Sequence, residues 1–195
     1  MRPDPAEAAR PPGPPGSASR SGMHGKTGHR RGTQTGSWPW LLGAMLIIAL
    51  DQASKAGIEH WFSLGERMAL VPGLLDLSLV YNRGAAFSFL AGAGGWQRWL
   101  FTAIGLAAAG WIVYLLRHAG SQRLFSAALM LILAGALGNV IDRLTRGQVV
   151  DFIVLYWQTY HWPAFNIADS AITIGAALLV IDELRRTRRR KRAPA

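Results

Sequence analysis

The sequence predicts a mainly α-helical membrane protein: a bundle of four transmembrane helices with a small β-sheet and an interfacial aromatic segment on its outer face. Two observations predict this fold class. Half of the 195 residues are hydrophobic, and they are gathered into long blocks rather than spread evenly. Four of these blocks are long enough to cross a hydrocarbon core of about 30 Å, which needs roughly 20 helical residues.

The four predicted spans differ in how many polar residues they carry, and the first and last each contain acids. They cover about 38–58, Trp96–Leu116, Leu124–Ile141 and Ile167 to about Leu184.

The distribution of Lys and Arg predicts the orientation of these spans. An even number of spans puts both termini on one side, and fifteen of the 21 Lys and Arg residues lie in residues 1–37, the loop 117–123 and the stretch Arg185–Arg192. The positive-inside rule assigns that side to the cytoplasm. The connections 59–95 and 142–166 are therefore predicted to lie on the outer face.

The sequence divides into one domain and two terminal segments. Residues 1–37 are rich in Pro, Gly, Ser and Arg and predict a disordered basic tail, without the features of a signal peptide. Residues 38–185 form the predicted membrane domain. Residues 186–195 form a basic cytoplasmic tail that is expected to fix orientation and to touch anionic lipid.

The composition excludes several function classes. The net charge of +10 is concentrated at the termini, which indicates topology rather than nucleic-acid binding. The absence of cysteine excludes a disulfide, a thiol nucleophile and a Cys-based metal site. No HExxH, GxSxG or P-loop motif is present, and no metal or cofactor is implied.

The two outer connections have different patterns. In LLDLSLVYN, residues 74–82, apolar and polar residues alternate with the period of a half-buried strand, which predicts a small sheet on the membrane surface. The second connection is rich in Trp, Tyr and His, the residue types that settle at the headgroup level. It is expected to skim the interface.

Polar residues in or beside a span are informative, because an Asp or Arg at mid-helix costs about 2.5–3.5 kcal/mol on insertion scales. Asp51 and Lys55 in DQASK are four residues apart on one helical face and can form an ion pair. This pair is either a structural anchor or part of a substrate-positioning site.

Two further motifs place polar groups at the predicted outer face. In GNVIDR, Asn139 and Asp142 can share a helix face, while Arg143 can reach the interface or hold a carboxylate; inter-helix polar contacts are the alternative. In NRGAAFS (82–88), Asn82 and Gly84 suit either a plain turn or contacts to an extended peptide.

Asp151 and Asp169 are the strongest candidates for chemistry. In FNIADS, Asn166 occupies the position of a helix N-cap and Asp169 falls in the first helical turn, near the positive end of the dipole. Asp151 lies eighteen residues earlier on the same predicted face. The alternative is that Asp169 only caps a helix and Asp151 is a solvated loop acid.

Two neighbouring carboxyl groups provide acid–base chemistry, because both cannot ionise cheaply and one proton is shared. The ionised acid can deprotonate a water while the protonated one assists the scissile carbonyl and the leaving amine. The helix-start position of Asp169 favours its ionised form, so the hypothesis is that Asp169 is the base and Asp151 the acid.

DQASK, NRGAAFS, GNVIDR, VVDF and FNIADS together resemble, in order and topology, the motifs of the lipoprotein signal peptidases, the bacterial signal peptidase II family. The resemblance covers about residues 38–185. It implies that Asp151 and Asp169 are a catalytic aspartate dyad. By the same motif matching it implies a supporting set of Asp51, Lys55, Asn82, Gly84, Asn139, Asp142, Arg143 and Asn166.

The resemblance also implies the substrate and the setting. The substrate would be a prolipoprotein with a diacylglyceryl-modified lipobox cysteine, cleaved immediately before that cysteine. The enzyme would act as a monomer in the bacterial inner membrane, with lipid as its other partner. Two rival functions remain: a transporter or proton channel, whose acids would be expected near the midplane, and a non-catalytic membrane scaffold.

Overall fold

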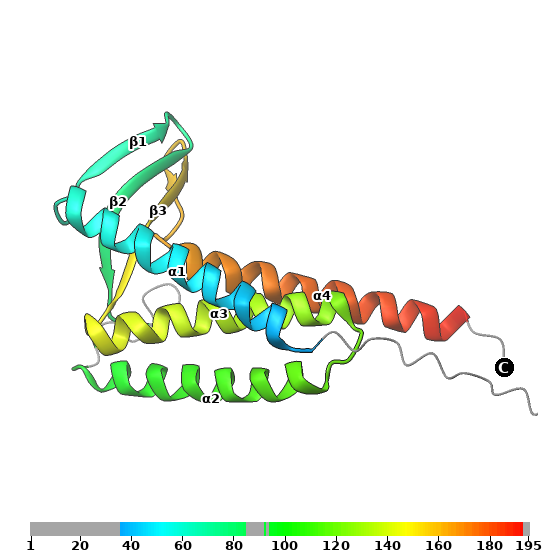
Figure 1. Cartoon of the computed structure of the whole chain (residues 1–195). Helices are drawn as coiled ribbons and strands as arrows, with labels where there is room; N and C mark the ends of the chain where they lie inside the picture. The colour runs from blue at the N-terminus through cyan, green and yellow to red at the C-terminus, as the bar shows by residue number, and fades with distance from the viewer. Residues whose placement is uncertain (1–35, 85–91, 93, 193–195) are drawn as a thin grey trace, which may run out of the picture. The chain divides into compact units, whose positions relative to one another are not determined.

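The structure is a computed structural model and describes residues 36–84, 92 and 94–192. The predicted tail 1–37 falls almost wholly outside the described residues, and so do residues 85–88 of the NRGAAFS motif. The described chain forms helices α1 (Trp38–Trp61), α2 (Trp96–His118), α3 (Arg123–Thr145) and α4 (Ile167–Arg192), together with four strands (Figure 1).

Three of the helices, α1, α2 and α3, are long and apolar enough to cross a membrane. Helix α4 is not in this group, and its apolar stretch carries Asp169, Asp182 and Glu183. The fourth crossing therefore stays a prediction. Helix α4 also continues through the basic segment to Arg192, so the described part of the predicted C-terminal tail is helical.

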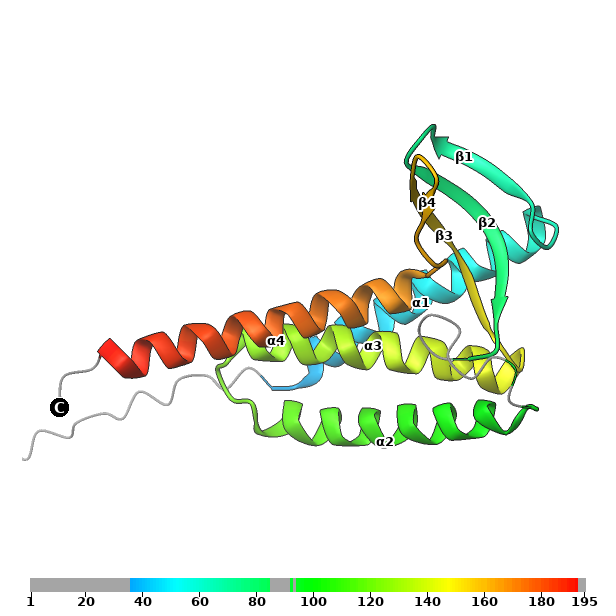
Figure 2. The ribbon, with the colours of Figure 1, turned by 180° about the vertical axis from the view of Figure 1, so that it is seen from behind.

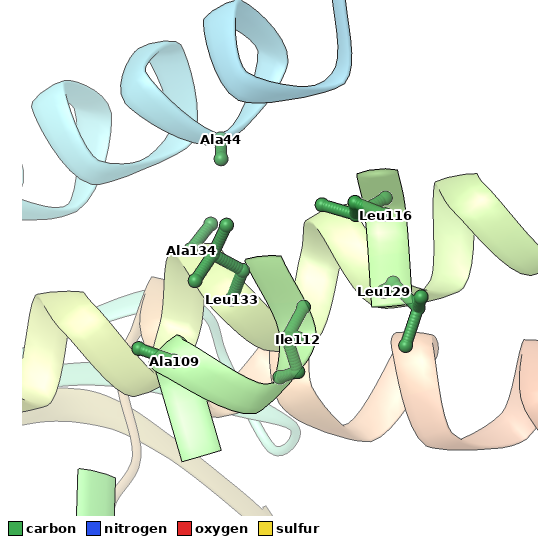
Figure 3. Packing of buried hydrophobic residues seen from close by; sticks show 7 residues of the cluster. All are labelled: Ala44, Ala109, Ile112, Leu116, Leu129, Leu133 and Ala134. Atoms are coloured by element: carbon green, nitrogen blue, oxygen red, sulfur yellow. The ribbon is translucent and has the colours of Figure 1, made fainter. Parts of the chain in front are cut away.

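Helix α3 is the centre of the bundle and packs against the other three helices. Its buried side chains meet apolar side chains of α1 and α2, and Figure 3 shows seven of them: Ala44, Ala109, Ile112, Leu116, Leu129, Leu133 and Ala134. The contact with α4 is closer still, because a Cβ atom added to Gly135 would lie 2.2 Å from the carbonyl oxygen of Ala168. Small residues let these two helix backbones approach, as is common between membrane helices.

The small predicted sheet is confirmed, and it is larger than the sequence predicted. Strands β1 (Arg67–Val71), β2 (Leu75–Asn82), β3 (Val149–Trp157) and β4 (Tyr160–His161) pair antiparallel in chain order. Strand β2 is the strand that the alternating pattern of 74–82 predicted.

Strand β3 was not predicted as a strand, since residues 142–166 were interpreted as a segment skimming the interface. The missing signal has a physical cause: Val149, Val150, Asp151 and Phe152 are all buried, so the beginning of β3 shows no alternation. The aromatic residues gather at the β3–β4 turn, where Trp157 and Tyr160 are exposed. Their place at a membrane interface stays a prediction.

The two ends of the bundle are different. The sheet lies at the end where α1 and α3 finish and α2 and α4 begin, which we call the site end (Figures 1 and 2). The pairing of β2 with β3 joins the two long connections, so the prediction that they lie on one side of the bundle is confirmed. At the opposite end, which we call the arginine end, α3 begins and α4 finishes.

Candidate active site

Asp151 and Asp169 reach the site end from a strand and from a helix. Asp151 lies on β3 opposite Val80 of β2, and only 2% of its surface is exposed. Asp169 lies in the first turn of α4 and is half-buried. Its backbone N–H donates to Oδ1 of Asn166 at 2.8 Å, which confirms the predicted helix cap.

Three asparagine amides hold the two carboxyl groups. Asn82 and Asn166 donate to the two oxygens of Asp151, at 3.0 and 2.7 Å. Asn139 donates to Oδ1 of Asp169 at 2.8 Å. Asn166 also donates to Oδ1 of Asn139 at 3.4 Å, so one chain of hydrogen bonds connects the two acids.

The surroundings of Asp151 favour its protonated form. Burial is the main cause and the nearby charge of Asp169 is the second, and together they raise the pKa of Asp151 from 3.8 to about 7, against the opposing hydrogen bonds of Asn82 and Asn166. A carboxyl group with this pKa can give or take a proton near neutral pH.

A layer of buried charge lies behind the asparagines. The Nζ atom of Lys55 is 2.7 Å from Oδ2 of Asp51 and 2.8 Å from Oδ2 of Asp142, and all three side chains are buried. Lys55 also donates to Oδ1 of Asn139 at 3.3 Å. The predicted Asp51–Lys55 ion pair is therefore confirmed, and Asp142 is a further partner of the same ammonium group.

The two acids of this layer bind the backbone just before each candidate catalytic residue. Oδ1 of Asp51 accepts from the N–H of Ala168 at 2.9 Å, and Oδ2 of Asp142 accepts from the N–H of Val150 at 3.2 Å. Ala168 precedes Asp169 and Val150 precedes Asp151. The layer thus fixes both segments that carry Asp151 and Asp169, a relation that no local sequence pattern contains.

Arg143 does not bind a carboxylate among the described residues, although one of its predicted roles was to hold one. Its guanidinium donates to the carbonyl oxygens of Gly84 at 3.0 Å and Asn139 at 3.3 Å. The N–H of Gly84 in turn donates to Oδ1 of Asn82 at 2.9 Å. Arg143 and Asn82 therefore hold the backbone at the beginning of the NRGAAFS motif.

The sequence reasoning missed three residues of this network, Gln52, Glu59 and Arg146. Gln52 and Arg146 each donate to Oδ1 of Asp142 at 2.9 Å, and Arg146 pairs with Glu59 at 2.8 Å. The spacing of Asp142 and Arg146, four residues apart, is a local signal that could have found Arg146. Gln52 and Glu59 reach this group from α1, so no local pattern indicates them.

The matching family model is described as signal peptidase (SPase) II, and it covers residues 43–185. A lipoprotein signal peptidase of Paraburkholderia phymatum is 59% identical over 150 residues, which are 77% of this chain and 90% of the relative. One from Ralstonia nicotianae is 55% identical over 169 residues, 87% of this chain and 97% of the relative.

Two solved structures, both described as bacterial membrane enzymes determined by the in meso method, share the fold. One has a TM-score of 0.73 at 33% identity and covers 81% of this chain and 94% of its own. The other has a TM-score of 0.67 at 34% identity, with 75% and 93% covered. The region matched by the family model contains all ten candidate site residues from the sequence motifs. Three helices are long and apolar enough to cross a bilayer, so the chain is a membrane protein. This chain belongs to the signal peptidase II family.

Proposed function

We propose that this protein is a membrane aspartyl endopeptidase that removes the signal peptide from diacylglyceryl-modified prolipoproteins, cleaving just before the lipidated cysteine. The observation that carries the proposal is the pair of carboxyl groups, Asp151 and Asp169, connected through Asn139 and Asn166 at one end of the bundle. Membership of the signal peptidase II family and its lipoprotein signal peptidase relatives support the substrate class.

In the proposed reaction Asp169 is the base and Asp151 the acid. Ionised Asp169 takes a proton from a water, whose oxygen attacks the scissile carbonyl carbon. Protonated Asp151 gives its proton to the carbonyl oxygen as the carbon becomes tetrahedral. When the C–N bond breaks, Asp169 gives its proton to the leaving amine and Asp151 recovers its proton from the collapsing hydroxyl group. The raised pKa of Asp151 supports its role as the initial acid.

The supporting residues would act through position and charge. Asn82, Asn139 and Asn166 orient the dyad, while Asp51, Lys55 and Asp142 anchor the segments that carry it. Gly84 and Arg143 would shape the backbone beside the substrate peptide.

The location follows the same proposal. A lipid-anchored substrate arrives in the plane of the membrane, so we place the site end at the outer face of the bacterial inner membrane and both termini in the cytoplasm. The enzyme would act as a monomer.

The deciding test uses purified protein in detergent with a diacylglyceryl-modified prolipoprotein. Asp151→Asn and Asp169→Asn should each lower kcat at least about 1,000-fold, within the range of lost acid–base catalysis. Glu183→Gln, which removes an exposed acid elsewhere on α4, should retain wild-type turnover. If either Asn variant melted like the wild type and kept near-normal turnover, the proposal of a catalytic dyad would be wrong.

A pH–rate profile tests the separate roles. Asp169→Asn should remove the acidic limb of the residual rate, because the base can no longer ionise, and Asp151→Asn should remove the alkaline limb. If both substitutions affect the same limb, the assignment of base and acid is wrong even though the dyad stands. A chelator should leave turnover unchanged, because no step of the proposal uses a metal.

A further inference from the structure

A cavity at the arginine end has a strongly basic lining. It has a volume of about 450 Å³ and lies between the beginning of α3 and the last turns of α4. Four arginines line it, with Asp182 as the one carboxylate among the lining residues that the structure describes; the arginines are Arg123, Arg185, Arg186 and Arg189. The cavity is therefore an environment for an anion.

One of the four lining arginines, Arg186, already has partners within the protein. The Nε atom of Arg186 is 2.7 Å from Oδ2 of Asp182, and its guanidinium also donates to Gln122 and lies 5.2 Å from the centre of the Phe125 ring. Within the described part of the chain no ion pair involves Arg123, Arg185 or Arg189. Three guanidinium groups thus remain for a ligand.

The lining arginines of α4 share one face of the helix. Residues 182, 185, 186 and 189 follow the spacing i, i+3, i+4, i+7, which places them together. Arg188, Arg190 and Lys191 belong to the same basic run and do not line the cavity. The cavity therefore involves only some of the basic residues at the end of α4, and the others lie outside its lining.

An apolar side chain lies beside these arginines, because Leu124 of α3 also lines the cavity. Ile181, next to Asp182 on α4, is 40% exposed, whereas the exposed Val180 and Leu184 lie on the opposite face of the helix. A ligand that fits both the arginines and the apolar lining has an anionic head and an apolar body. A lipid meets this description, whereas a free anion has no group to cover Leu124.

We propose that this cavity binds the headgroup phosphate of an anionic membrane phospholipid, whose acyl chains lie along α4. Guanidinium groups match the geometry of phosphate oxygens and bind them with two parallel hydrogen bonds. The first turn of α3 adds the positive end of a helix dipole. Basic pockets between membrane helices are recognised sites for such headgroups.

The proposed lipid site is far from the proposed peptidase site and independent of its reaction. Twenty residues of α4 separate Asp169 from Arg189, about 30 Å at the helical rise of 1.5 Å per residue. Loss of the lipid site should leave cleavage in detergent unchanged, and loss of the dyad should leave lipid binding unchanged.

The test measures lipid retention by the full-length protein with native mass spectrometry in detergent. Dioleoyl phosphatidylglycerol, dioleoyl phosphatidylcholine and inorganic phosphate are titrated separately. We expect the anionic lipid to bind about tenfold more tightly than the zwitterionic lipid, and phosphate at millimolar concentration to leave it in place.

Matched pairs of substitutions separate the cavity from general charge. Arg185→Gln with Arg189→Gln should weaken binding of phosphatidylglycerol about tenfold, while Arg188→Gln with Arg190→Gln, which removes the same charge from the same helix, should change it less than about twofold. Arg123→Gln, on the opposite wall, should also weaken binding. The melting temperature of each variant in detergent confirms that it is folded.

Three results would each overturn the proposal. Equal losses from the two arginine pairs would show diffuse attraction by the whole basic segment. Equal affinity for the two lipids would show that the phosphate charge is not recognised. Complete displacement of the lipid by millimolar phosphate would show a site for a free anion.

Discussion

The two ends of the bundle handle charge in opposite ways. At the site end Asp51, Lys55 and Asp142 are fully buried, and each has several hydrogen-bonding or ionic partners. At the arginine end the side chains of Arg123, Arg185 and Arg189 are exposed and form no ion pair within the described chain. Burial makes the first set rigid and costly to change, whereas solvent makes the second set adaptable.

Helix α4 contributes charged side chains to both ends. Helix α4 carries Asp169 in its first turn and arginines in its last turns, so its dipole favours the charge at each terminus. At its beginning, the cap by Asn166 and the bond from Ala168 to Asp51 fix the backbone. At the other end of α4, four arginines and Asp182 line the cavity without such a fixing network.

The largest expected effect comes from removing the buried cation. Lys55→Met leaves Asp51 and Asp142 facing each other without their shared ammonium group, and should lower the free energy of unfolding by about 3–5 kcal/mol. Lys191→Met, the same change at an exposed position of the arginine end, should change it by less than about 0.5 kcal/mol. Thermal unfolding in detergent measures both.

Similar losses for the two lysines would contradict the contrast between a buried network and solvated charge. Complete loss of folding in Lys55→Met would agree with the prediction. The milder Lys55→Arg variant should have a free energy of unfolding between those of Lys55→Met and the wild type.

The second effect depends on pH. The pKa of Asp151 is raised to about 7 from 3.8, so the folded protein keeps this proton at pH values where the unfolded chain has lost it. The free energy of unfolding therefore falls as pH rises between about 4 and 7, since the folded state binds more protons. Asn at this position cannot ionise and should remove this fall.

Between pH 5 and pH 8 the free energy of unfolding of Asp151→Asn should therefore rise by roughly 2–3 kcal/mol relative to that of the wild type. This figure follows from about 1.4 kcal/mol per pKa unit. Melting temperatures at the two pH values provide the comparison. If the difference in free energy of unfolding between Asp151→Asn and the wild type were the same at both pH values, Asp151 would not be held in its protonated form.

The third effect concerns the close contact of α3 and α4. Gly135→Ala places a Cβ atom 2.2 Å from the carbonyl oxygen of Ala168, so α4 must shift at the turn that carries Asp169. We expect a loss of about 1–3 kcal/mol together with lower kcat. Gly110→Ala, on a face of α2 with nothing within 4 Å, should be neutral or stabilise the protein by up to about 1 kcal/mol.

If both alanine variants kept full turnover, the close approach of α3 and α4 would have no part in placing Asp169. A stability loss without a loss of kcat would limit the contact to packing.

Features of the fold that depend on local pattern could be predicted from the amino-acid sequence. Long apolar blocks indicated the helices, alternation indicated β2, and the FNIADS motif indicated the cap by Asn166, because each signal lies within a few residues of the chain. The ordered polar motifs also contain the ten candidate site residues, so these residues can be predicted without knowledge of their contacts. The dyad role of Asp151 and Asp169 stays a prediction, with their placement at one end of the bundle in its favour.

Which side chains contact one another depends on tertiary packing and could not be predicted in this way. Strand β3 is buried along its first four residues and therefore has no period that a sequence pattern can detect. Lys55 contacts Asp142 from another helix, and Asp51 and Asp142 hold the backbone of Ala168 and Val150 across separations of 117 and 8 residues. Local periodicity reports which side of an element is apolar, whereas the partners of a buried charge depend on how distant elements pack.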